Sequence, residues 1–387
     1  MKRYPMFDPP EYVDWKPASG IIEEYQHTIS RDPERARLIS STSPNQLLDM
    51  YAGMVRFRLH DITLRRWVKQ GILAKAWLGT GEEAVTIGNV HALDRKIDKV
   101  GPMIRNAGAC HEMGLPLADM LREYLATADS PSHGKDLHVG SMEYGVIAPV
   151  SQVAALVPVV AGIALAFKQR GERRVVLTWI GDGATKTTAF HEGMNFAAVL
   201  KVPAVYVLQN NQIALGTRLD QHQAGPFTAW SKAYGITAFS CDGNNVLDTY
   251  AATKLAADLA RNGSGPAIVT AETFRMGGHA THDEAEAREI CGAELFEYWG
   301  KRDPIGTYES WLEAQGVSKT TLDETEQKVI AELAQAEKEA LASREKNMPK
   351  PETAIAGVYA ETAAAPAGKW SEPESPKAGS TRKTPSR

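Results

Sequence analysis

Residues 175–211 read VVLTWIGDGATKTTAFHEGMNFAAVLKVPAVYVLQNN, and this stretch decides the fold. It opens with an apolar, β-branched run, Val175–Ile180, whose length suits a buried parallel strand. From about Thr188 apolar residues recur at helical spacing, which predicts an amphipathic helix that Pro203 terminates. Ala204–Leu208 predicts the next strand. The stretch therefore predicts a strand–helix–strand unit of a parallel sheet.

A polar residue follows each of these two strands. Asp182 stands between Gly181 and Gly183, and Asn211 comes 29 positions after Asp182. The carboxyl ends of the strands in such a unit open on one crevice, so we expect the two side chains to converge. Their oxygens suit Mg²⁺, and the N–H groups of the glycine turn suit a diphosphate. A Gly-Asp-Gly turn or an Asn-Asn pair alone is an ordinary loop feature, and only the combination indicates a site.

The segment from Gly181 to Asn211 resembles the thiamine-diphosphate motif of a known family. This family is the alpha subunit of the decarboxylase (first) component of 2-oxo acid dehydrogenase complexes, whose members handle pyruvate, branched-chain 2-oxo acids or acetoin. The resemblance covers about residues 45–350 and implies the α/β thiamine-diphosphate-binding fold, with a parallel central sheet flanked by helices. Three further motifs carry it: 79–84 (GTGEEA), 103–108 (MIRNAG) and 277–283 (GGHATHD).

The resemblance also implies a role for several single residues. Arg105 would bind the diphosphate, for which a guanidinium is a natural partner. Val153, close to Ser151, would hold the cofactor in its bent form. His279 would be the catalytic residue that reaches cofactor and substrate. Without the resemblance, we would interpret Arg105 as a surface arginine and His279 as an ordinary loop histidine. Ser151 and Val153 would simply pack in the core.

The implied ligand sets are larger. The magnesium ligands would be Asp182, Asn211 and the backbone carbonyl of Ile213. The residues implied for cofactor binding are Arg105, Ser151, Val153, Gly181, Asp182, Gly183, Ala184, Asn211, Ile213 and His279.

The chain departs from the family pattern at several positions. Ile104 replaces a tyrosine beside Arg105, which puts one diphosphate hydrogen bond in doubt. Ala155-Leu156 replaces a Thr-Gln pair that helps to hold potassium in branched-chain relatives, so we expect that ion site to be absent. Ala280 replaces the serine that is phosphorylated in animal relatives. Thr188 and Gln209 also differ from the residues that the family has at these positions, but neither difference removes a metal ligand.

No residue of the chain matches the glutamate that activates the aminopyrimidine ring in this family. The resemblance implies that a separate beta subunit supplies it, in an assembly of two alpha and two beta chains. It also implies a small 2-oxo acid substrate and a lipoyl acyltransferase core that receives the acyl group. The motif that includes Arg105 slightly favours branched-chain 2-oxo acids over pyruvate, and an acetoin-type subunit is an alternative.

Two other functions are compatible with the motif. A self-sufficient thiamine enzyme related to transketolase would need a second domain, for which the segment after Asp283 leaves little room. A scaffold subunit could keep the fold without catalysis, but the presence of Asp182, Asn211 and His279 argues against it.

Composition narrows the class of protein and its location. The 387 residues carry a net charge of −4, so nucleic acid is not an expected partner. Three scattered cysteines and no signal-peptide pattern lead us to expect a cytoplasmic protein. Residues 144–167 lack charge, yet their prolines and polar residues favour a packed helix over a membrane span.

We expect three regions along the chain. Residues 1–44 show no clear period and read as an extended N-terminal arm that lies over a partner. Residues 45–350 form the α/β domain, which begins with a helix after the N-cap Ser43 and ends in a helical region. Residues 362–387 are rich in Pro, Ser and Lys and are expected to be a disordered tail.

Overall fold

The structure, a computed structural model, describes residues 1–357. The chain divides into a large unit, Met1–Met348, and a second unit from Pro349 onward. The regular structure described in the second unit is the short 3₁₀ helix η2 (Pro351–Thr353). The tail predicted at 362–387 lies outside the described residues. The sheet and the candidate site belong to the large unit.

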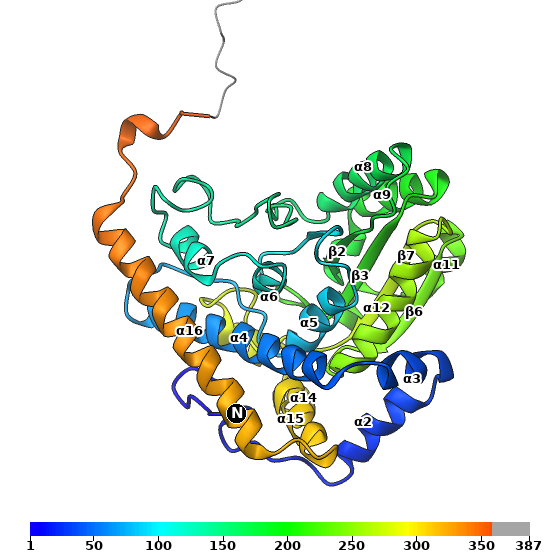
Figure 1. The fold of residues 1–387 in the computed structure, drawn as a ribbon, viewed down its shortest axis with the longest axis horizontal. Helices are drawn as coiled ribbons and strands as arrows, with labels where there is room; N and C mark the ends of the chain where they lie inside the picture. Colours follow the sequence, from blue (N-terminus) through cyan, green and yellow to red (C-terminus); the bar gives the residue numbers. More distant parts are fainter. Residues whose placement is uncertain (358–387) are drawn as a thin grey trace, which may run out of the picture. The chain divides into compact units, whose positions relative to one another are not determined.

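A five-stranded parallel sheet forms the centre of the large unit, in the order β1-β2-β3-β7-β6 (Figure 1). The predicted α/β fold with a central parallel sheet is thus confirmed. A separate pair of short strands, β4 and β5, is antiparallel. The strands are β1 (Lys99–Gly101), β2 (Val176–Gly181), β3 (Ala204–Asn210), β4 (Ile213–Ala214), β5 (Thr217–Arg218), β6 (Thr237–Asp242) and β7 (Ala267–Glu272).

Helices surround this sheet, and the predicted helical C-terminal region is present. They are α1 (Pro10–Val13), α2 (Ile21–Ser30), α3 (Pro33–Ser40), α4 (Pro44–Lys69), α5 (Glu83–His91), α6 (Ala107–Glu112), α7 (Leu117–Tyr124), α8 (Leu156–Gln169), the 3₁₀ helix η1 (Gly183–Lys186), α9 (Thr188–Leu200), α10 (Leu219–His222), α11 (Ala229–Tyr234), α12 (Val246–Arg261), α13 (Glu284–Cys291), α14 (Ala293–Gly300), α15 (Pro304–Ala314) and α16 (Lys319–Lys346).

The strand–helix–strand unit at the centre matches its sequence. Strand β2 leads through η1 into α9, where the Thr187 hydroxyl caps the helix by accepting a hydrogen bond of 3.2 Å from the Phe190 amide. The helix ends at Leu200, and Lys201 follows with a left-handed φ of 47°. The helix thus ends three positions earlier than Pro203, where the sequence predicted its end. Strand β3 begins at Ala204.

Both faces of the sheet are buried, which explains why its strands are continuously apolar. Val176 and Ile180 of β2 pack on one face, with α8 and α9. Leu177 and Trp179 alternate with them and pack on the other face, with α4, α5 and α12. Of the uncharged stretch 144–167, residues 156–167 lie in α8, which packs against this sheet as predicted. Within residues 1–357, no helix combines the length and apolar character that a membrane crossing needs.

An apolar patch remains exposed near the start and on the outer side of α8 and α9. Val150 and Val153 precede α8 and are 44% and 58% exposed. Val159 lies on α8, and Phe196 and Val199 lie on α9, with exposures of 47%, 45% and 72%. These five side chains lie on or next to two helices that pack against each other, and we call them the apolar patch; exposed apolar patches mark interaction surfaces.

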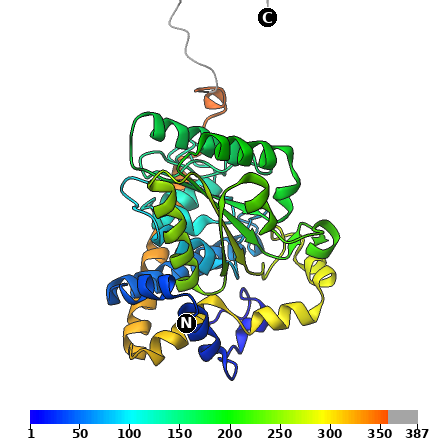
Figure 2. The same cartoon turned by 90° about the vertical axis from the view of Figure 1, so that its right-hand side faces the viewer.

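The prediction of an extended N-terminal arm is wrong. The helices α1, α2 and α3 lie within residues 10–40, and α2 lies beside α15 of the same chain (Figure 2). Arg35 of α3 is buried and pairs with Asp248 of α12 at 2.7 Å from Nη1 to Oδ1. The segment thus belongs to the core of the large unit.

A buried group of charges fixes the N-terminal segment to the domain. Arg58 of α4 pairs with Glu83 and, at 3.0 Å from Nη2 to Oδ1, with Asp303. Arg3 reaches the same Asp303 at 2.7 Å, and the ring of Tyr12 lies 4.8 Å from the Arg58 guanidinium carbon. Burial alone would raise the pKa of Asp303, but Arg3 and Arg58 hold it at about 2.

Candidate active site

A cavity of about 450 Å³ lies at the carboxyl ends of β2 and β3. This is the edge at which parallel α/β sheets bind ligands. The cavity brings together every residue implied for cofactor binding. Its lining includes Arg105, Ser151, Val153, Gly181, Asp182, Gly183, Ala184, Asn211, Ile213 and His279.

Asp182 and Asn211 each present a buried oxygen that has no protein partner. Asp182 Oδ1 accepts a hydrogen bond of 2.7 Å from the Gly183 amide, while Oδ2 has none. Asn211 donates through Nδ2 to Glu82 Oε1 at 2.8 Å, and its Oδ1 is also unpaired. An unpaired buried acceptor is costly, so two of them on residues that line one cavity fit a positive or hydrogen-bonding ligand. Burial raises the pKa of Asp182, which a bound cation would oppose.

The third implied metal ligand is the carbonyl of Ile213, at the start of β4. This oxygen accepts a long hydrogen bond of 3.4 Å from Arg275 Nη1, so it keeps capacity for a second partner. Positive φ values at Gln212 (72°) and Leu215 (55°) turn the chain sharply around it. The residues therefore fit a small hard cation.

The donor set limits which cations fit. Residues 1–357 contain no group of three His, Cys, Asp or Glu side chains placed to hold a metal. One carboxylate, one amide and one carbonyl oxygen leave room for phosphate and water oxygens, as Mg²⁺ requires.

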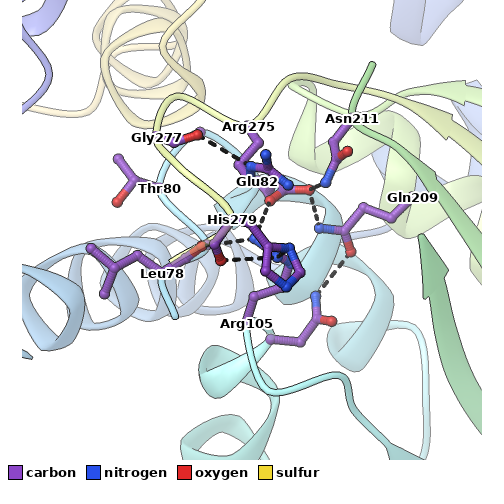
Figure 3. Close-up of polar contacts among 12 residues, drawn as sticks. Leu78, Thr80, Glu82, Arg105, Gln209, Asn211, Arg275, Gly277 and His279 are labelled. Carbon is purple, nitrogen blue, oxygen red and sulfur yellow. Dashed lines mark hydrogen bonds and ion pairs between the residues drawn. The ribbon is translucent and has the colours of Figure 1, made fainter. Parts of the chain in front are cut away.

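Arg105 and His279 both line the cavity, and their side chains contact one another directly (Figure 3). Arg105 Nη2 donates to His279 Nδ1 at 3.1 Å and to its carbonyl at 3.3 Å. Burial, together with the charges of Arg105 and Arg275, lowers the pKa of His279 to about 4. The imidazole is therefore neutral near pH 7, with Nδ1 as acceptor and the proton on Nε2.

Ser151 and Val153 lie at the mouth of the cavity. The Ser151 hydroxyl is 3.2 Å from His138 Nε2, and His138 Nδ1 is 2.7 Å from Asp136 Oδ1. Val153 is largely exposed, because no side chain of the described residues covers it. This side of the cavity is open.

The two glycines beside Asp182 face different surroundings. A Cβ at Gly183 would lie 2.3 Å from the Ala214 Cβ, which is a severe overlap. A Cβ at Gly181 would meet only Met103 Sδ, at 4.0 Å. Gly183 is therefore required for packing, whereas Gly181 leaves space at the cavity.

We expect Gly183→Ala to destabilise the protein without ligand by about 1–3 kcal/mol, because the added methyl overpacks the turn against Ala214. Gly181→Ala is the matched control and should change stability by less than about 0.5 kcal/mol. Urea denaturation of both variants measures the difference. Equal stability of the two would contradict the assigned contact.

Sequence reasoning missed two residues that support the site. Glu82 is buried and accepts hydrogen bonds from both Gln209 and Asn211. Arg275 is buried beside Arg105, and burial together with that charge lowers its pKa to about 10. Glu82 lies within the motif at 79–84, and Arg275 lies two positions before the motif at 277–283. These motifs were therefore the sequence feature that could have indicated both residues.

The parallel sheet and the cavity at its carboxyl edge define an α/β protein of the thiamine-diphosphate-binding fold. Residues 51–352 match the family model described as "Dehydrogenase E1 component". The chain belongs to this family of oxidoreductases, which depends on thiamine diphosphate.

Named relatives agree with this assignment. The chain is 31% identical over 324 residues to the 2-oxoisovalerate dehydrogenase subunit alpha of Bacillus subtilis, a match that covers 82% of this chain and 96% of the relative. It is 33% identical over 304 residues to the pyruvate dehydrogenase E1 component subunit alpha of Bacillus cereus, with 78% of each chain covered. The corresponding subunit of Staphylococcus aureus is 31% identical over 327 residues, with 83% of each chain covered.

Proposed function

We propose that the chain is the alpha subunit of a 2-oxo acid dehydrogenase decarboxylase component. It binds the diphosphate half of thiamine diphosphate through Arg105 and the Gly181–Ala184 turn. Asp182, Asn211 and the Ile213 carbonyl would hold the Mg²⁺ that accompanies the diphosphate. The unpaired, buried oxygens of Asp182 and Asn211 at one cavity carry this proposal.

The residues of the chain bind and orient, and one of them handles a proton. Bound thiamine diphosphate supplies the carbon nucleophile and the electron sink for loss of CO₂. With a diphosphate in the cavity, Arg105 would bind its oxygens, and His279 Nδ1 would lose the hydrogen bond that Arg105 Nη2 donates to it here. His279, neutral with its proton on Nε2, would donate a hydrogen bond from Nε2–H to the reacting group. Val153 and Ser151 line the same cavity and would border the aminopyrimidine and thiazolium rings.

The activating glutamate comes from a beta subunit, in an assembly of two alpha and two beta chains. Among the described residues, Asp182 is the single carboxylate that lines the cavity, and the metal uses it. The open mouth at Val153 and the exposed apolar patch on α8 and α9 support a partner at this side. A lipoyl acyltransferase core receives the acyl group.

Purifying the chain with and without a candidate beta subunit tests the shared site. We expect decarboxylation of a 2-oxo acid to be at least about 100-fold slower without the partner, because a positioned acid–base group contributes about 10²–10⁴-fold. An inactive beta subunit with its glutamate replaced serves as the control for assembly alone. Full activity of the isolated chain would overturn the proposal.

The substrate is a small 2-oxo acid, and we propose a branched-chain one ahead of pyruvate. The Arg105-Asn106-Ala107-Gly108 segment supports this, since it lacks the histidine found in many pyruvate-type members. Identities of 31% and 33% to the two kinds of relative do not separate them. A panel of 2-oxo acids and acetoin, offered to the assembled enzyme, decides the substrate. Titration of the assembled protein with thiamine diphosphate measures cofactor binding and so separates an enzyme from a scaffold subunit. The cytoplasmic location stays a prediction.

A further inference from the structure

Glu82 is a fully buried carboxylate immediately behind the cavity. It stands at the N-cap position of α5 and has no exposed surface. Its Oε1 accepts hydrogen bonds from the side-chain amides of Gln209 and of Asn211, the latter at 2.8 Å (Figure 3). It is not part of the cavity lining, so it contacts Asn211 from the side away from the ligand.

A carboxylate can only accept hydrogen bonds, and this fixes how the Asn211 amide is turned. The NH₂ group of Asn211 must face Glu82, and Oδ1 must then face away from it. That Oδ1 is the unpaired oxygen at the cavity. A neutral or donating group at position 82 would remove this requirement and allow the amide to flip its nitrogen towards the cation.

The position of Glu82 is supported from its other side by a chain of hydrogen bonds. Asn106 Nδ2 lies 2.8 Å from Thr86 Oγ1 and 2.9 Å from Gln209 Oε1. With its oxygen engaged by Asn106, Gln209 turns its NH₂ towards Glu82. The second carboxylate oxygen, Oε2, lies 3.9 Å from Arg105 Nη1. One buried carboxylate therefore links the residue proposed to hold the metal with the one proposed to bind the diphosphate.

We propose that Glu82 is a positioning residue, which directs Asn211 Oδ1 at the Mg²⁺ position without touching the metal. This inference rests on the proposed function of the site. Outer-shell partners of metal ligands change metal affinity by about 10–100-fold when they are replaced.

A reciprocal exchange tests the orientation directly in the assembled enzyme. Asn211→Asp alone places a second carboxylate against Glu82. The measured quantity is the Mg²⁺ concentration that gives half-maximal thermal stabilisation at fixed thiamine diphosphate. We expect this concentration to rise about 10–100-fold. Adding Glu82→Gln keeps the total charge of the pair unchanged. The amide nitrogen introduced at position 82 can then donate to the carboxylate introduced at position 211, whose other oxygen faces the cation. We expect the double variant to recover about tenfold over Asn211→Asp.

A second variant keeps the proposal testable if the double variant does not fold. Glu82→Ala removes the acceptor without adding charge, and we expect it to raise the Mg²⁺ requirement about 10–100-fold. Unfolding without ligand is measured in parallel, because a purely structural role would lower stability and leave the Mg²⁺ requirement of the folded protein unchanged.

Asp182→Ala separates this inference from the proposed function. If Asp182→Ala keeps the wild-type Mg²⁺ response, the metal site itself is wrong. Two outcomes overturn only the role of Glu82. In the first, Asp182→Ala loses the Mg²⁺ response but Glu82→Ala keeps it. In the second, the double variant needs as much Mg²⁺ as Asn211→Asp alone.

Discussion

Asp182→Ala is expected to abolish the Mg²⁺-dependent thermal stabilisation that thiamine diphosphate gives the assembled enzyme. Asp182 is the single carboxylate at the cavity among the described residues, so its loss removes the one anionic ligand that we propose for the cation in this part of the chain. A ligand at 100 times its Kd stabilises a protein by about 2.7 kcal/mol, and this whole increment should disappear. Thermal unfolding with and without Mg²⁺ and thiamine diphosphate measures it.

The unfolding of Asp182→Ala without ligand should change by no more than about 1 kcal/mol, because the variant loses one hydrogen bond, from the Gly183 amide to Oδ1, while Oδ2 has no protein partner to lose. Asp220→Ala is the matched control, since this carboxylate is exposed and lies outside the cavity. The control should retain the full response to cofactor. A response retained by Asp182→Ala as well would show that another residue holds the metal.

Arg58→Ala is expected to destabilise the fold by about 3–5 kcal/mol, which is the usual cost of removing one partner from a buried ion pair. Arg58 lies between Glu83 and Asp303, and all three side chains are buried. Burial raises the pKa of Glu83 to about 7 even with Arg58 beside it, so its charge depends on that partner. Urea denaturation gives the free energy of unfolding.

Lys301→Ala provides the comparison for Arg58, because Lys301 forms an exposed pair with Glu297 on the surface of α14. Exposed pairs contribute little, so this variant should unfold close to the wild type. If Arg58→Ala unfolds like Lys301→Ala, the buried charges do not fix the N-terminal segment in the way the structure indicates.

Local sequence was sufficient for the centre of the fold and for Asp182 and Asn211, whereas the other cavity residues were predicted through the resemblance of four motifs to a known family. Val175–Ile180 and Ala204–Leu208 lie at β2 and β3, because continuous apolar runs that are buried on both faces have few alternatives. Asp182 and Asn211 meet because both follow parallel strands. The roles implied for the cavity residues stay predictions.

Long-range contacts explain what the sequence did not reveal. The partners of Glu82 lie 127 and 129 positions away, and no local pattern connects them. The N-terminal helices are only 4 to 10 residues long, too short for a clear hydrophobic period. They are held by pairs such as Arg35–Asp248, 213 positions apart, which only the folded chain brings together.

The apolar patch on α8 and α9 also has a consequence for how a cell makes this protein. Val153, Phe196 and Val199 are exposed as long as no partner covers them. A chain produced in excess of the proposed beta subunit would therefore engage chaperones or aggregate through this surface. Balanced synthesis of the two chains would avoid this, and heterologous production of the enzyme calls for co-expression.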